Sequence, residues 1–269
     1  MSEPFPAIDR RAARRNFERA APGYAGASRL EAEIGARMLE RLDYMKLAPQ
    51  RVLDAGSGPP RRLLGRRYPK AQVIALDFAL PMLRAGRSGL DFFRKRLSIC
   101  GDLERLPLAA ESMDLVWSNM ALHWALEPLA VFHEFARVLA PEGLLMFSTL
   151  GPDTLKELRL AAGSARVHAF LDMHDLGDML VAAGFSAPVM DMELVTLRYA
   201  GAAQLVEDLR ASGQANARRD RARGLSGKRW RAQMLAGAAQ ASFEVVYGHA
   251  WRGAPREDAK RIRIFKRLP

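Results

Sequence analysis

The stretch from Arg51 to Pro60, RVLDAGSGPP, decides the fold, because it changes from a buried strand to a glycine turn without a spacer. Its second and third residues, Val and Leu, are branched and apolar, as a buried parallel strand requires. Asp54 closes the strand, and a turn built on Gly56 and Gly58 follows. Such a turn before a helix points backbone N–H donors at bound negative charge. The stretch favours a loop for a nucleotide-like or carboxylate-bearing cofactor, although a plain tight turn has the same short motif.

An acidic residue at the end of a second strand, Gln72 to Asp77 (QVIALD), supports the cofactor interpretation. In doubly wound folds a carboxylate roughly twenty residues after the glycine turn accepts hydrogen bonds from the ribose hydroxyls of an adenosine cofactor. Asp77 could instead cap the following helix. Phe78 and Met82 come next and place apolar side chains where an adenine ring would lie beside its ribose.

Two more strands are predicted to end at the same edge of the sheet. Leu97 to Gly101 is the third strand, and Asp102 after it could accept from the amino group of adenine or cap the next turn. Met113 to Asn119 is the fourth, and no Asn/Asp-Pro-Pro-aromatic tetrapeptide follows it. That absence argues against the enzymes that methylate amino groups on bases. His123 and Trp124 lie close after this strand, near the expected crevice.

The remaining pattern indicates an α/β protein with a doubly wound, mostly parallel sheet. A helix over 128–139, a Pro-Glu-Gly turn at 141–143 and a strand over 144–149 complete five strands that alternate with helices. Beyond Gly151, alternation over 189–198 and an apolar run over 243–251 indicate further strands.

Composition narrows the class of protein. The 269 residues suit one large domain or a domain with an appendage, and the hydrophobic content of 49% is enough to fill a core. No run of eighteen apolar residues and no hydrophobic N-terminal stretch occurs, so we expect a cytoplasmic protein without a membrane span or secretory signal. The single cysteine, Cys100, excludes an internal disulfide and a multi-cysteine metal site. The net charge of +11 favours an acidic partner, unless it reflects only an arginine-rich proteome.

The chain resembles class I S-adenosylmethionine-dependent methyltransferases in the glycine loop, the two strand-end aspartates, Leu106-Pro107-Leu108, DLVWSN with its following ALHW, and Pro141-Glu-Gly143. More closely, it is similar to the malonyl-acyl-carrier-protein O-methyltransferases of biotin synthesis. The similar segments are F-x-x-A-A-x-x-Y from Phe17 to Tyr24, the W-S-N and A-L-x-W stretches, and FSTLGPDTLKELR after the fifth strand. That last segment is also similar to a mitochondrial complex I assembly factor, which has a methyltransferase fold and hydroxylates an arginine.

The resemblance implies a Rossmann-like sheet of seven strands, the last of them antiparallel. It implies a helical lid over 1–48, a cofactor-binding half over 49–150, and a C-terminal part of the same domain over 151–269 with a substrate-side insertion before the last strand. S-adenosylmethionine is the implied cofactor, with no metal. The implied cofactor-binding residues are Asp54, Gly56, Ser57, Gly58, Asp77, Phe78, Met82, Asp102, Leu103 and Asn119.

One departure from the family pattern concerns cofactor affinity, and three residues are candidates for positioning the reacting groups. Pro59-Pro60 stands where the family usually has a third glycine, which removes two N–H donors, although the fixed φ of proline suits a helix start. The resemblance places Tyr24 in the lid over the methyl group. We interpret His123 as a positioning or packing residue rather than a general base, and Trp124 as a wall of the site.

The implied reaction is methyl transfer to the free carboxylate of a malonyl thioester on acyl carrier protein, which needs alignment more than a base. The arginines at positions 218, 219, 221 and 223 are predicted to meet this acidic carrier beside the entrance, or else to form a solvated loop. A nucleic-acid partner is not expected. Alternative functions are a protein-arginine assembly factor and a methyltransferase of RNA or a small metabolite.

Overall fold

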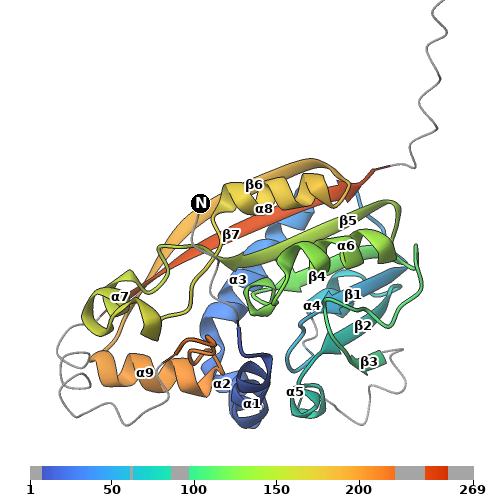
Figure 1. Ribbon diagram of the computed structural model, residues 1–269. Coiled ribbons are helices and arrows are strands. Elements are labelled where there is room, and N and C mark those ends of the chain that lie inside the picture. The colour runs from blue at the N-terminus through green and yellow to red at the C-terminus, as the bar shows by residue number, and fades with distance from the viewer. Residues whose placement is uncertain (1–7, 61–62, 86–96, 222–239, 254–269) are drawn as a thin grey trace, which may run out of the picture.

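The computed structural model describes residues 8–60, 63–85, 97–221 and 240–253, which form one seven-stranded sheet with helices on both faces (Figure 1). The strands are β1 (Arg51–Ala55), β2 (Gln72–Asp77), β3 (Leu97–Cys100), β4 (Met113–Asn119), β5 (Leu139–Leu150), β6 (Phe185–Arg198) and β7 (Gln240–Arg252). The α-helices are α1 (Arg10–Ala20), α2 (Tyr24–Ala27), α3 (Arg29–Arg41), α4 (Leu63–Arg67), α5 (Leu80–Ala85), α6 (Pro128–Val138), α7 (Lys156–Ala162), α8 (Met173–Ala182) and α9 (Ala202–Ala211).

The sheet has the strand order β3-β2-β1-β4-β5-β7-β6, and its first five strands are parallel. The expected doubly wound sheet is therefore confirmed. Val52 of β1 pairs with Val73 of β2 on one side and with Leu115 of β4 on the other. The chain reverses direction across the sheet between β1 and β4, and in open α/β sheets ligands bind outside the strand ends at this point.

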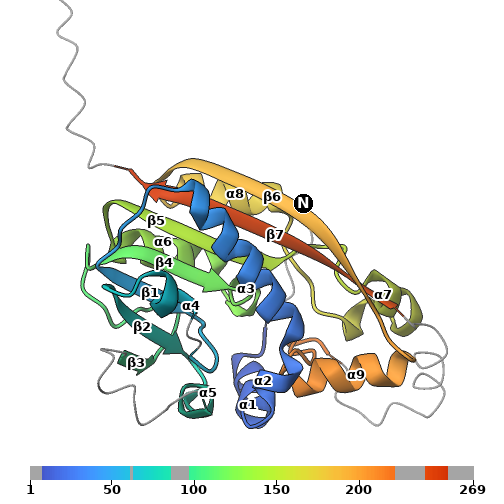
Figure 2. The same ribbon diagram turned by 180° about the vertical axis from the view of Figure 1, so that it is seen from behind.

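Each face of the sheet has its own hydrophobic core. On one face α3 buries Ile34 and Met38, which lie one helical turn apart (Figure 2). On the other face α6 buries Phe132 and Phe135, and α8 adds Leu176. The sheet is therefore packed between two apolar layers, and its carboxyl edge is left to carry the polar side chains.

Strand β5 begins earlier than the sequence predicts. The expected turn at 141–143 lies inside the strand as an irregularity, because Leu139 pairs with Met113 while Leu144 already pairs with Leu115. Within it, Glu142 has a φ of 61°. An added Cβ on Gly143 would lie 2.8 Å from the carbonyl oxygen of Ala140. Proline and glycine therefore mark a bulge here rather than the end of pairing.

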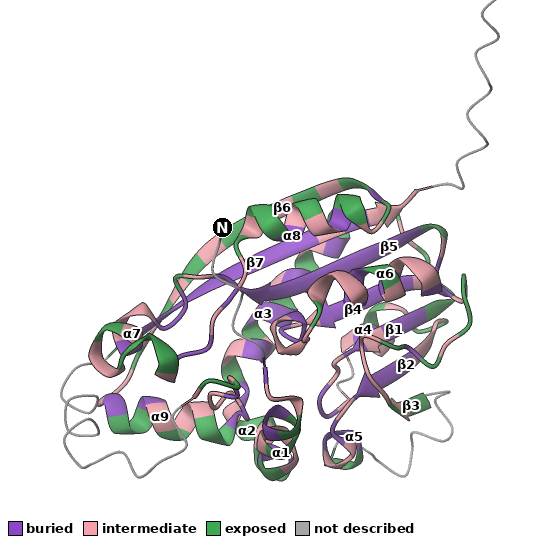
Figure 3. Ribbon diagram, in the orientation of Figure 1, coloured by how far each residue is buried: buried purple, intermediate pink, exposed green. Residues whose placement is uncertain are grey.

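Strand β7 lies between β5 and β6 and runs antiparallel to both, as the resemblance implies for the last strand. Figure 3 shows β5 and β7 as mostly buried, whereas the edge strand β6 alternates between exposed and partly buried residues. Helix α7 starts at Lys156, and no side chain of the described residues caps its first turn. A helix that the sequence predicts over 229–239 lies outside the described residues. None of the described helices combines the length and apolar character that crossing a bilayer requires.

Candidate active site

The glycine loop follows β1 directly, and its backbone N–H groups are used within the protein. Gly56 and Gly58 have φ values of +73° and +59°, which favour glycine. The N–H groups of Gly56 and Ser57 donate to the carbonyl oxygen of Leu76, at 2.8 and 3.0 Å. The N–H of Gly58 donates to Asp77 at 2.9 Å. The expectation that these donors point at a ligand is therefore wrong, because the neighbouring strand β2 already uses them.

Asp77 ends β2 and is buried, with only 6% of its surface exposed. One carboxylate oxygen accepts from the N–H of Gly58 and the other from the N–H of Ala79, at 2.9 and 2.8 Å. Burial raises the pKa of Asp77 to about 6, against the lowering effect of these two hydrogen bonds. A carboxylate can accept about four hydrogen bonds, so two positions remain for hydroxyl donors.

A cavity of about 320 Å³ runs along the carboxyl edge of the sheet from the glycine loop to the end of β3. Eight of the ten predicted cofactor residues line it, and Tyr24 and Trp124 do as well: Gly56, Gly58, Asp77, Phe78, Met82, Asp102, Leu103, Asn119, Tyr24 and Trp124. The side-chain amide of Asn119 also donates to the carbonyl oxygen of Glu31, and its oxygen accepts from Ser148. Asn119 therefore also ties β4 to α3 and β5.

The other two predicted cofactor residues, Asp54 and Ser57, line a small adjoining cavity of about 40 Å³. Glu31, which is buried, lines the same space and accepts a hydrogen bond from Gln214. Gly56 and Asn119 border both cavities. The predicted residues are thus collected along one continuous row of the sheet edge.

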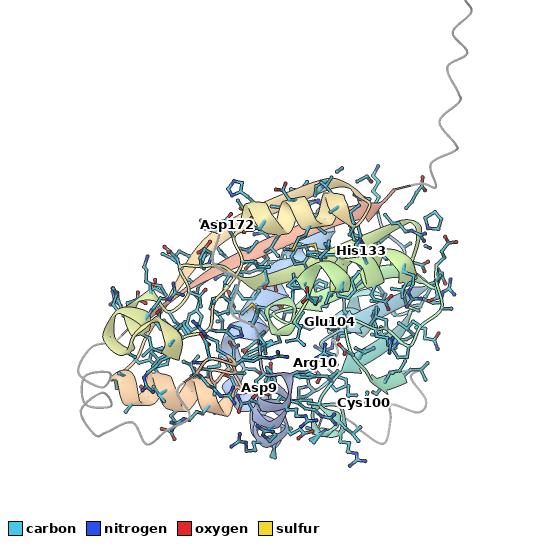
Figure 4. The ribbon with its side chains drawn as sticks, in the orientation of Figure 1. Asp9, Arg10, Cys100, Glu104, His133 and Asp172 are labelled. Carbon is cyan, nitrogen blue, oxygen red and sulfur yellow. The ribbon has the colours of Figure 1, made fainter. Side chains whose placement is uncertain are left out.

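Helix α1 supplies residues of the site that the sequence analysis missed. Arg10 forms ion pairs with Asp102 at 2.7 Å and with Glu104 at 2.6 Å, and Figure 4 shows Arg10 and Glu104 close together beside the sheet. Arg14 and Phe17, one and two turns along the helix, also line the cavity. Their spacing of four and three residues places all three on one helix face, a signal present in the sequence.

The aromatic wall of the cavity joins the N-terminal helices to the sheet. Phe17 packs edge-on against Phe78 and Trp124, with ring centres 5.7 and 5.1 Å apart. The ring of Tyr24 lies 3.4 Å from the position of a Cβ on Gly58. Residues of α1 and α2 therefore cover the glycine loop from the outside, in the place that the resemblance gives to a lid.

His123 does not line the cofactor cavity. It borders a second cavity of about 240 Å³, and Trp124 is shared between the two. The pKa of His123 lies well below its usual range, mainly because the ring is removed from water and secondly because His168 is near. The ring is therefore neutral at pH 7. Its Nδ1 lies 3.2 Å from the hydroxyl of Thr149. A ring with so low a pKa is a weak base, and it lies outside the cofactor cavity, so His123 fits the positioning role better than that of a general base.

The predicted partner arginines make contacts within the chain. Arg218 pairs with Asp220 and donates to the carbonyl oxygen of Ser164 at 2.9 Å. Arg221 pairs with Asp9 at 2.9 Å. Arg219 donates to the carbonyl oxygen of Ile8 at 3.2 Å, and Arg223 lies outside the described residues. These contacts fasten the start of α1 to the segment after α9.

The cavity fits an adenosine-bearing cofactor in size and chemistry. It combines a buried carboxylate with free acceptor positions at β2, a second carboxylate after β3, and apolar walls at Phe78, Met82 and Leu103. Gly56 lets Ala121 pack closely against the loop at the cavity wall, since a Cβ on Gly56 would lie 2.2 Å from that of Ala121. Among the described residues, no group of three or more His, Cys, Asp or Glu side chains could hold a metal ion.

Comparison with known proteins agrees with this geometry. Residues 53–147 match the model of a methyltransferase domain. The chain is 48% identical to a malonyl-acyl-carrier-protein O-methyltransferase of Gallionella capsiferriformans, over 96% of each chain. It is 50% identical to one of a Methylovorus species, over 93% of this chain and 91% of that one.

Solved structures share the fold at low sequence identity. The YcgJ protein of Bacillus subtilis is 17% identical and superposes with a TM-score of 0.59, covering 82% of this chain and all of that one. A methyltransferase of Thermotoga maritima is 16% identical with a TM-score of 0.54, covering 88% of this chain and 99% of that one. At this identity the likeness shows the fold alone.

Proposed function

Because the chain belongs to the malonyl-acyl-carrier-protein O-methyltransferase family, we propose that it transfers the methyl group of S-adenosylmethionine to the free carboxylate of a malonyl thioester on acyl carrier protein, in biotin synthesis. The observation that carries the proposal is the identity of 48–50% with two such enzymes over more than nine tenths of the chain. A cytoplasmic location, which the sequence predicts, is part of the same proposal. The relatives favour this function over arginine modification and over methylation of RNA or a small metabolite.

The reaction asks the protein for alignment and exclusion of water. S-adenosylmethionine supplies an activated methyl group on a sulfonium, and a malonyl carboxylate is ionised at neutral pH. No residue therefore has to remove a proton, and proximity supplies most of the acceleration. Asp77 would hold the ribose, while Tyr24, Phe17 and Trp124 close the cavity against water. The positive and negative charges cancel as the ester forms, so a dry, apolar surrounding favours the transfer.

Purified protein tests the proposal with S-adenosylmethionine carrying a labelled methyl group. We expect label on malonyl-acyl carrier protein as an alkali-labile methyl ester, and none on acetyl-acyl carrier protein, which lacks the free carboxylate. Label in RNA or in a small metabolite, with none on malonyl-acyl carrier protein, would contradict the proposed acceptor. Hydroxylation of a protein arginine, with no methyl ester formed, would favour the assembly-factor function.

Binding of S-adenosylmethionine is expected to weaken as the pH falls, because the ribose hydroxyls need the ionised form of Asp77. Burial raises the pKa of this carboxyl to about 6, so the free protein takes up a proton below that pH, and the bound ligand opposes the uptake. The dissociation constant should rise about tenfold from about pH 7 to about pH 5 and level off above pH 7. Titration calorimetry measures it. Asp77→Asn should bind weakly and equally at both pH values; a flat wild-type profile would contradict the assignment.

A carrier protein would meet exposed arginines on α1 rather than the cluster around Arg218. Arg11 and Arg15 are exposed, and α1 packs on the segment near Ala217 that borders the second cavity. Reversing both charges to Glu should raise the Michaelis constant for malonyl-acyl carrier protein roughly tenfold at low ionic strength. The constant for malonyl-coenzyme A, which lacks the carrier protein, should change little.

The matched variant is Arg219→Glu with Arg221→Glu, which reverses the same number of charges. Because Arg221 pairs with Asp9 and Arg219 holds the carbonyl of Ile8, we expect losses on both substrates and a lower melting temperature. If this variant raises the Michaelis constant for malonyl-acyl carrier protein alone, and the α1 variant does not, the carrier protein docks on the arginines around Arg218 and not on α1.

A further inference from the structure

The second cavity adjoins the cofactor cavity at Trp124, but none of the ten predicted cofactor-binding residues lines it. Its walls are largely apolar, with Leu150, Leu158 and Phe243 among them. They include the buried His168 as well as the exposed Arg210, so the cavity reaches from the interior to the surface. A volume of about 240 Å³ is enough for a slender chain of atoms to enter beside Trp124.

Three residues that line this cavity each have a buried ring nitrogen without a hydrogen-bond partner among the described residues. The nitrogens are Nε2 of His123, Nε1 of Trp124 and Nε2 of His168. The ring of Trp124 lies 5.0 Å from that of His168 and 5.4 Å from that of His123, centre to centre. Buried polar atoms without partners are costly, so three of them together call for a ligand.

The partners of the other ring nitrogens indicate which atoms would donate. Nδ1 of His168 lies 2.9 Å from the carbonyl oxygen of Ala169 and must donate to it, which leaves Nε2 of the neutral ring as an acceptor. If the hydroxyl of Thr149 donates to Nδ1 of His123, Nε2 of that ring carries the proton. Trp124 can only donate. With this tautomer of His123 the site offers two donors and one acceptor.

We propose that this second cavity binds the acyl-pantetheine arm of the acceptor, with His123 and Trp124 donating to the oxygens of the malonyl group and His168 accepting from an amide N–H of the arm. The inference rests on the proposed function. It places the malonyl carboxylate at Trp124, the residue common to both cavities, and the thioester arm along the apolar walls toward the surface.

Neutral hydrogen-bonding groups are better suited than a cation to bind a carboxylate that becomes a methyl ester. Burial lowers the pKa of His168 to about 4 and that of His123 well below its usual range, so both rings are uncharged at pH 7. The acceptor carboxylate loses its charge when the oxygen–methyl bond forms and the sulfur–methyl bond breaks. A paired guanidinium would hold the carboxylate back and be left unpaired afterwards, whereas neutral donors can bind both the acid and the ester.

The test compares His168→Leu with His168→Gln, which keeps an acceptor near Nε2. We expect His168→Leu to raise the Michaelis constant for malonyl-coenzyme A and for malonyl-acyl carrier protein at least fivefold. The dissociation constant for S-adenosylmethionine should stay unchanged, and His168→Gln should restore the Michaelis constant to within about twofold of wild type. His133→Leu, on the exposed side of α6 (Figure 4), is the control and should match wild type.

A filling variant gives an independent measurement that leaves the polar atoms in place. Ala162→Phe adds a ring to the wall of the second cavity and should raise both Michaelis constants without affecting cofactor affinity. If His168→Leu does not fold, this variant decides. Unchanged Michaelis constants in either variant would overturn the inference. A wild-type protein that methylates no malonyl thioester would instead refute the proposed function.

Discussion

Replacing Gly56 with alanine is expected to lower the affinity for S-adenosylmethionine at least a hundredfold and to destabilise the fold by about 2–4 kcal/mol. The new Cβ would lie 2.2 Å from the Cβ of Ala121, which is buried, and the φ of +73° disfavours any side chain. Ala121 lines the cofactor cavity too, so relief of the clash must move one wall against the other. Titration calorimetry and thermal unfolding measure the two effects.

Two further variants isolate the cause. Gly58→Ala has a φ of +59° but meets the ring of Tyr24 at 3.4 Å, an ordinary contact, so its losses should be much smaller. Gly56→Ala combined with Ala121→Gly removes the clash and keeps the backbone strain, and we expect it to recover most of the affinity. If the double variant binds as poorly as Gly56→Ala alone, strain in the loop rather than crowding is responsible.

Asp77→Ala is expected to weaken S-adenosylmethionine at least tenfold, since charged hydrogen bonds to two ribose hydroxyls contribute roughly 1.5–3 kcal/mol. The variant also leaves the N–H groups of Gly58 and Ala79 without their acceptor, which should loosen the loop and lower the melting temperature. Calorimetry gives the binding loss directly. Asp102→Ala is a useful comparison, because Asp102 is partly exposed and paired with Arg10. Equal affinity of Asp77→Ala and wild type would remove Asp77 from the site.

The fold and the cofactor-binding residues at the sheet edge can be predicted from the sequence, because both depend on local patterns. A buried strand followed by glycines, and acidic residues after the next two strands, are visible in the order of residues alone. Parallel strands bring their carboxyl ends to one edge, so the topology itself collects Gly56, Asp77 and Asp102. The family resemblance adds Tyr24, whose place over Gly58 no periodicity indicates.

What the sequence does not show are contacts between distant segments. His168 lies 45 positions beyond His123, in a connection without periodic pattern, and its burial follows only from the packed structure. The donors of the glycine loop are used by Leu76, which no local motif records. Likewise, charge alone cannot reveal that Arg221 faces Asp9 across more than two hundred residues.

The place of β7 has a consequence for the order in which the protein forms during synthesis. This strand is the last of the seven in the chain, yet it lies between β5 and β6 and pairs with both. Until residues 240–252 have left the ribosome, β5 has an open edge and β6 has no neighbour, and open edges invite pairing with other chains. Strands β1 to β4, which carry the cofactor edge, can already assemble, so the nascent chain would gain its binding edge before its sheet is closed.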